Sequence, residues 1–119
     1  MGFKLNHIHL KSPDPEKTAR FYADYLGAKI IGQRRTGFRL DLHGLPVNVS
    51  RFQEARTHQQ VYGIEHIALD TDDFSTMVAK LKDNGVRILE ETTTGGGRRA
   101  CFFEGPEGVC LEVVETVKS

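Results

Sequence analysis

Two histidines, His7 and His66, occupy matching places in two similar stretches of the chain. One stretch reads LNHIHLKSPDPEKTARFYADYLGAKII from Leu5, and the other reads IEHIALDTDDFSTMVAKLKDNGVRIL from Ile64. Only five of the 119 residues are histidine, so chance is a poor explanation of the match. Imidazole is the commonest metal ligand of proteins. The repeat therefore predicts a metal site to which each half of the chain contributes one histidine.

A carboxylate near the carboxy terminus is the third candidate ligand. In the segment GVCLEVVE, strand alternation places Cys110, Glu112 and Val114 on one face. A carboxylate among such modest apolar groups is costly unless a cation meets it. Two imidazoles and one carboxylate leave coordination positions open for water or substrate. A site of this kind acts as a Lewis acid.

Each stretch has the local pattern that would position such ligands. In the first, residues 5–11 alternate as a strand does, Asp14 and Pro15 suit a helix start, and Gly27 suits its end. The expected helices cover 16–25 and 73–84, with Gly85 ending the second. The further expected strands are GAKIIGQRR, TGFRLDLHG and LPVNVSRF in the first half, and 64–70, 86–91, GRRACFFEG and GVCLEVVE in the second.

This order predicts an α+β fold of two tandem βαβββ modules, residues 1–55 and 60–119, within one domain of residues 1–119. One module of this size buries too little surface to be stable by itself. We therefore expect the modules to pair into a curved sheet cup.

Composition excludes several classes of function. Sixteen basic and sixteen acidic side chains give no net charge, which argues against nucleic acid as a partner. No apolar run approaches the roughly 18 residues of a membrane span. The amino terminus does not look like a signal peptide, so we expect a cytoplasmic protein. Two cysteines cannot form a disulfide framework.

The segments HIHLKSPDPEKTARFYADYLG and GPEGVCLEVVE resemble the two signatures of the vicinal oxygen chelate superfamily, the glyoxalase I, bleomycin-resistance and extradiol dioxygenase group. The resemblance covers nearly the whole chain. It implies a glyoxalase-like fold and maps His7, His66 and Glu112 onto metal-ligand positions. The resemblance favours His7 over His9 as the ligand, because in the family the ligand lies fourteen residues before a Phe-Tyr pair, which here is Phe21–Tyr22. His9 points to the same face and is a candidate catalytic or substrate-touching group.

The chain departs from glyoxalase I at one position. Laying LHGLPVNVS over PEGVCLEVV places Asn48 where those enzymes carry a second glutamate. An amide is a weak ligand and no useful base, which disfavours glyoxalase I itself. A His-His-Glu set resembles extradiol dioxygenases and fosfomycin-resistance thiol transferases. An amide at the possible fourth position resembles epimerases such as methylmalonyl-CoA epimerase, although those use glutamine.

We therefore expect a divalent-metal enzyme, with Fe, Ni, Zn, Mn or Co as the ion and a small molecule with adjacent oxygens as the substrate. Stabilising an enolate there would give a lyase or isomerase, with Glu112, a metal-bound hydroxide or His9 as the base. The alternatives are an Fe(II) dioxygenase, a thiol transferase and a metal-free binder of the bleomycin-resistance kind. The resemblance also implies a homodimer with sites at or near the subunit interface.

Basic residues offer a further candidate for substrate binding. They are Arg34, Arg35, Arg39, Arg51, Arg98 and Arg99. An arginine pair grips a carboxylate or phosphate through two parallel hydrogen bonds. For any single one of them, ordinary solvated charge is the more common role. The glycine run of TTTGGGRRA lacks the lysine and serine of a phosphate loop and predicts a flexible loop.

Overall fold

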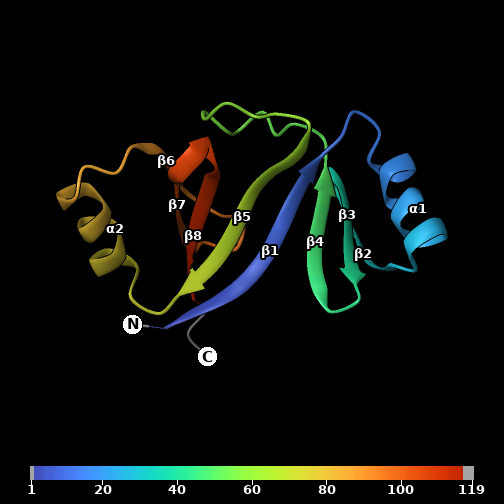
Figure 1. Cartoon of the computed structure of the whole chain (residues 1–119), viewed down its shortest axis with the longest axis horizontal. Helices are drawn as coiled ribbons and strands as arrows, with labels where there is room; N and C mark the ends of the chain where they lie inside the picture. Colours follow the sequence, from blue (N-terminus) through green and yellow to red (C-terminus); the bar gives the residue numbers. More distant parts are fainter. Residues whose placement is uncertain (1, 117–119) are drawn as a thin grey trace. The chain divides into compact units, whose positions relative to one another are not determined.

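The computed structural model describes residues 2–116. Its elements are β1 (Phe3–Lys11), α1 (Pro15–Leu26), β2 (Lys29–Arg34), β3 (Gly37–Leu42), β4 (Leu45–Ser50), β5 (Gly63–Thr71), α2 (Phe74–Asp83), β6 (Ile88–Thr93), β7 (Arg99–Glu104), the 3-10 turn η1 (Pro106–Gly108) and β8 (Cys110–Glu115). The predicted α+β class and the βαβββ order of each half are confirmed (Figure 1).

The chain divides into two compact units, which are described separately. The first unit is His7–Glu65; the second comprises the residues up to Asn6 and those from His66 onward. Strands β1 and β5 each contribute to both units, so the units are not bounded like the sequence modules.

In the first unit, β1 pairs with β4 in parallel, and β3 pairs with β4 and β2 antiparallel. Helix α1 packs on one face of these strands. Its Ala19 and Tyr22 lie against an apolar cluster of strand residues, namely Leu10, Leu40, Val47 and Val49. The helix begins as expected, because the Asp14 side chain accepts from the Lys17 amide. It ends at Gly27, whose φ of 72° suits glycine.

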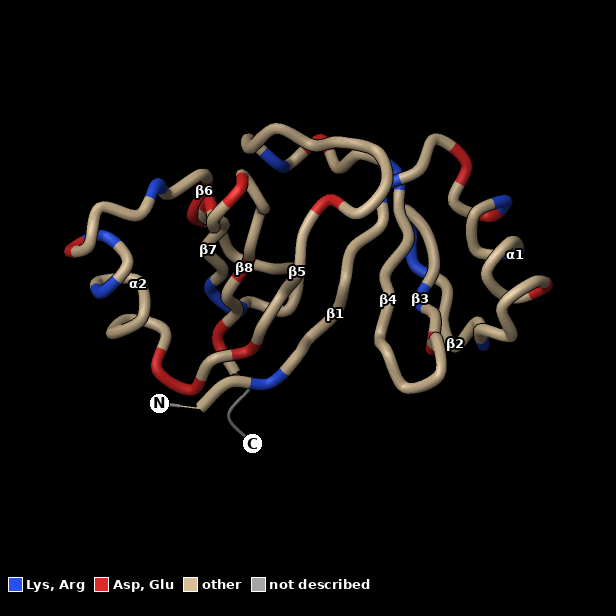
Figure 2. Tube along the Cα trace, viewed as in Figure 1, with Lys and Arg blue, Asp and Glu red and all other residues tan. Residues whose placement is uncertain are grey.

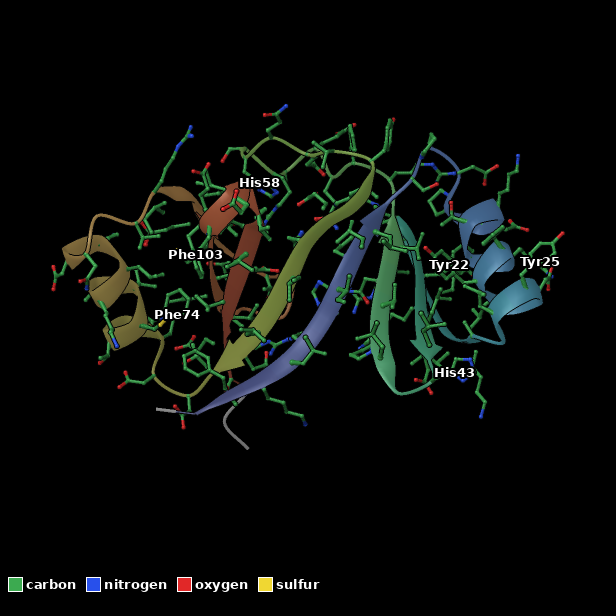
Figure 3. The ribbon with its side chains drawn as sticks, viewed as in Figure 1. Tyr22, Tyr25, His43, His58, Phe74 and Phe103 are labelled. Atoms are coloured by element: carbon green, nitrogen blue, oxygen red, sulfur yellow. The ribbon has the colours of Figure 1, made fainter. Side chains whose placement is uncertain are left out.

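The second unit repeats this plan. There β8 pairs in parallel with β5 and antiparallel with β7, which pairs with β6. Asp73 caps α2, and Gly85 follows the helix with a φ of 73°. The core lies between α2 and one face of the strands, where Phe74 and Phe103 are labelled in Figure 3.

Strand register shows which positions of the two units are equivalent. In the first unit Asn48 lies between His9 on β1 and Arg39 on β3. In the second unit Glu112 lies between Ala68 on β5 and Phe102 on β7. His9 and Ala68 each stand two residues after the repeated histidine. The register thus places Asn48 and Glu112 at equivalent positions, as the overlay of the two sequence segments predicts.

Some boundaries differ from the sequence prediction. Strand β1 already begins at Phe3, and β6 covers Ile88–Thr93, later than expected, with a register shift between Ile88 and Glu90. The glycine-rich segment forms a turn closed by a hydrogen bond from the Thr94 amide to the Arg98 carbonyl, 2.7 Å long. Within residues 2–116, neither helix has the length and apolar character needed to cross a bilayer.

Candidate metal centre

In the second unit, the structure brings two of the predicted ligands together. His66 on β5 and Glu112 on β8 are both buried, and Nε2 of the histidine lies 3.2 Å from Oε1 of the carboxylate. Alternation along β8 turns Val113 toward α2 and Glu112 to the opposite face. The Phe102 ring stands edge-on to the imidazole at 5.1 Å and forms an apolar wall.

This pair fits a divalent cation. A nitrogen and an oxygen each about 2.0–2.2 Å from one tetrahedral ion lie a little over 3 Å apart, close to the observed separation. A carboxylate held in a buried place also needs a cationic partner. Either a protonated imidazole or a metal ion would meet that need, and the geometry accommodates both.

In the first unit, His7 and His9 form a second close pair on β1. Both rings are buried, and Nε2 of His7 lies 3.3 Å from Nδ1 of His9. They stand on the same face of the strand, with their ring planes inclined by 67°. The sequence prediction that His9 shares the face of His7 is therefore correct in the structure.

A buried polar network continues from His9 within the first unit. Nε2 of His9 lies 2.7 Å from the Ser50 hydroxyl, to which Lys11 donates at 3.3 Å. Lys11 lies 3.7 Å from Glu65, whose other oxygen is 2.8 Å from Nε2 of His58. The side chains of Lys11, Glu65 and His58 are each only 1% exposed.

Sequence reasoning missed this network. The ring of His58, which lies in the connection between the two halves of the sequence, is buried against Glu65 (Figure 3 labels His58). His7, His9 and Lys11 stand at every second position of one strand. This strand alternation could have predicted that the three side chains share one face. The partners Ser50 and Glu65 are far away in sequence, and no local pattern identifies them.

Asn48 is also buried, at 4% exposure, and its side-chain oxygen has no hydrogen-bond partner among the described residues. Such an acceptor is costly to bury unless a donor or a cation meets it. The position predicted as a possible fourth ligand thus carries an unsatisfied oxygen.

The arginines fall into two groups. In the second unit Arg98 pairs with Asp70, and Arg99 pairs with Glu115 at 2.8 Å and stacks on Phe74. The bond to Glu115 raises the pKa of Arg99. Glu115 is thus engaged in an ion pair with Arg99.

In the first unit, by contrast, Arg34, Arg35 and Arg51 line an open surface pocket with Phe38. Burial and the nearby Arg39 lower the pKa of Arg34. Figure 2 shows basic positions near β3.

Comparison with known proteins identifies the class of protein. The sequence profile of the Glyoxalase/Bleomycin resistance protein/Dioxygenase superfamily matches residues 4–113. The chain belongs to this superfamily, as its sequence signatures indicated.

Individual relatives differ in activity. The metallothiol transferase FosB of Staphylococcus epidermidis is 31% identical, over 92% of this chain and 81% of that protein. A putative lactoylglutathione lyase of Brassica oleracea var. gemmifera is 23% identical over 92% of this chain. The chain covers only 43% of the length of that lyase. The names of both relatives are those of enzymes.

Solved structures share the fold. A hypothetical protein from Bacillus halodurans C-125 superposes with a TM-score of 0.79 and 21% identity, covering 100% of this chain and 98% of the other. A methylmalonyl-CoA epimerase of Streptomyces coelicolor, in complex with 2-nitronate-propionyl-CoA, gives a TM-score of 0.67 and 25% identity. That alignment covers 97% of this chain and 98% of the epimerase. The glyoxalase-like fold expected from the sequence is thus confirmed.

Proposed function

We propose that this chain is a divalent-metal-dependent lyase or isomerase acting on a small substrate with adjacent oxygens. His7, His66 and Glu112 are the proposed metal ligands. The observation that carries the proposal is the buried contact between His66 and Glu112, at 3.2 Å, in a member of a superfamily that includes a metallothiol transferase. Nitrogen and carboxylate ligands suit Zn, Fe, Ni, Co or Mn.

The proposed chemistry is proton transfer next to a carbonyl group. A bound divalent ion would polarise the substrate carbonyl and stabilise negative charge on its oxygen. We assign the proton acceptor to Glu112, because its carboxylate is buried and a carboxylate can act as a general base. A divalent ion bound by both side chains would hold that carboxylate in position, since Nε2 of His66 and Oε1 of Glu112 lie 3.2 Å apart.

A thiol transferase is the second candidate. Two observations favour it: the 31% identity to metallothiol transferase FosB, and the amide of Asn48 where glyoxalase I enzymes have a second carboxylate. In this reaction the thiolate sulfur would bond to an epoxide carbon of a substrate such as fosfomycin, and the carbon–oxygen bond at that carbon would break. The proton lost by the thiol would end on the released oxygen, which the bound ion would stabilise, so no second carboxylate base would be required.

Incubation in D2O distinguishes these candidates. Zinc-, nickel- and iron-loaded protein would be mixed with a panel of 2-hydroxy ketones, hemithioacetals and branched acyl thioesters, and separately with fosfomycin and small thiols. We expect deuterium next to the carbonyl of at least one panel member by mass spectrometry, lost in Glu112→Gln but retained in His43→Asn. A thiol adduct of fosfomycin without exchange would favour the transferase. Exchange that persists in Glu112→Gln would contradict the proposed role of Glu112.

A further inference from the structure

The Ser50 hydroxyl determines which nitrogen of His9 carries a proton. Its oxygen contacts the Arg51 carbonyl at 2.9 Å, Lys11 Nζ at 3.3 Å and His9 Nε2 at 2.7 Å. The carbonyl only accepts, the ammonium only donates, and the hydroxyl has one hydrogen to give. We assign that hydrogen to the carbonyl, as the 2.9 Å contact allows, so that Nε2 of His9 donates to Ser50.

This assignment leaves Nδ1 of neutral His9 with a lone pair. That atom faces Nε2 of His7, 3.3 Å away. Two imidazole nitrogens about 2.0–2.1 Å from one tetrahedral ion lie about 3.4 Å apart, so the observed spacing fits two ligands of one cation. In the absence of metal, a proton on Nε2 of His7 bridges the same two atoms.

We propose that His9 is a further protein ligand of the metal and binds it through Nδ1, while Ser50 and Lys11 hold it in the tautomer that exposes this atom. This inference rests on the proposed metal site. It changes the role of His9 from a candidate base to a ligand. His9 pairs in register with Asn48, so an imidazole lies beside the position where a carboxylate ligand is missing.

Lys11 has a defined part in this arrangement. Its ammonium is buried, is balanced by Glu65, and occupies one acceptor site of the Ser50 oxygen. The hydroxyl hydrogen is thereby directed to the Arg51 carbonyl and away from His9. Hydrogen bonds to the far nitrogen of a ligand histidine commonly fix its tautomer and orientation. Ser50 and Lys11 are accordingly positioning residues, since neither is itself a proposed ligand.

Long-range proton–nitrogen NMR of protein with 15N-labelled histidine tests the inference, and it does so without an activity assay. At pH 8 and without metal, we expect His9 to carry its proton on Nε2. On addition of one equivalent of zinc, the His9 Nδ1 resonance should move to the range of metal-bound imidazole. In Ser50→Ala, His9 should populate both tautomers, and the zinc Kd should rise about 10-fold, as for other residues that orient a ligand.

Substitutions of His9 test the inference further. His9→Ala and the bulkier His9→Gln should each raise the zinc Kd by about 100-fold or more, the upper end of the loss seen for a group that only orients a ligand. His43→Asn, at an exposed turn, should not. A proton on Nδ1 of His9, or a Nδ1 resonance unmoved while His66 responds to zinc, would overturn the inference and leave the proposed function standing. A wild type in which no histidine responds to zinc would overturn both.

Discussion

The difference between Asn48 and Glu112 is the chemically important asymmetry of the chain. Register makes their positions equivalent, yet one is an amide and the other a carboxylate. A carboxylate is both a stronger ligand and a usable base. Enzymes that need a carboxylate in each half would therefore be impaired by the amide.

This asymmetry predicts poor activity as a glyoxalase I. Turnover of the hemithioacetal of methylglyoxal and glutathione should stay well below roughly 100 s⁻¹, a common enzyme rate, even with nickel or zinc bound. Asn48→Glu should raise it, while Asn48→Gln should not, because an amide of any length supplies no base. A wild-type rate of roughly 100 s⁻¹ or more by the standard absorbance assay would refute the argument from Asn48.

At the level of elements, the start of α1 depends on a single side chain. The Asp14 carboxylate accepts from the Lys17 amide at 3.1 Å. We expect Asp14→Ala to lower the free energy of unfolding by about 1 kcal/mol, measured by urea denaturation. Asp24→Ala, an exposed change in the same helix, should alter it by less than about 0.5 kcal/mol. Equal losses in the two variants would show that the cap does not stabilise the helix.

Burial of Cys101 on β7, under α2, predicts a loss of stability in alkali. Desolvation, with Glu91 nearby, raises the pKa of this thiol from 9.0 to about 11. Between these values the unfolded chain loses the proton while the folded chain keeps it, so stability falls as the pH rises. The stability advantage of wild type over Cys101→Ala should therefore shrink from pH 9 to pH 11. An advantage independent of pH between wild type and Cys101→Ala would contradict the assignment.

Helices and strands were predictable from the sequence where the residues that specify them lie within a few positions of one another. Asp14, Gly27, Asp73 and Gly85 mark the helix ends, and each does so in the structure because caps act over a few residues. Alternation in β8 likewise predicted that Glu112 and Val113 lie on opposite faces, and in the structure Val113 packs against α2.

The residues that form the polar network around His9 were not predictable from the sequence. Ser50 approaches from another strand, 41 residues away in the chain, and Glu65 and His58 complete the network from beyond β4. A single sequence does not specify which distant polar residues will meet. The face of His9 was visible in the sequence, whereas its tautomer required the hydroxyl of Ser50.

At the level of the whole molecule, the family resemblance and several exposed apolar side chains favour self-association. Phe21, Tyr25 and Ile31 of the first unit are 54%, 77% and 58% exposed, and Figure 3 shows Tyr25 pointing away from the strands. Apolar surface of this kind commonly marks a protein interface. We expect a homodimer by light scattering at micromolar concentration.

Mixing of variant subunits tests whether each metal site of the dimer combines residues from both chains. If it does, inactive His7→Ala and Glu112→Ala proteins should regain part of their metal binding after verified exchange, since one pocket of each heterodimer is intact. A stable dimer without rescue would place each metal within one chain. A monomer would refute the expected assembly.

Metal binding by the purified protein tests the central claim most directly. Protein prepared without chelators should bind one divalent ion per chain, measured by elemental analysis and by titration calorimetry with zinc. His66→Ala should lose this tight binding while remaining folded by circular dichroism, and His43→Asn, which tolerates the left-handed φ of 52° at that turn, should keep it. Unchanged stoichiometry and affinity in His66→Ala, or a wild type that binds no divalent ion, would contradict the proposed site.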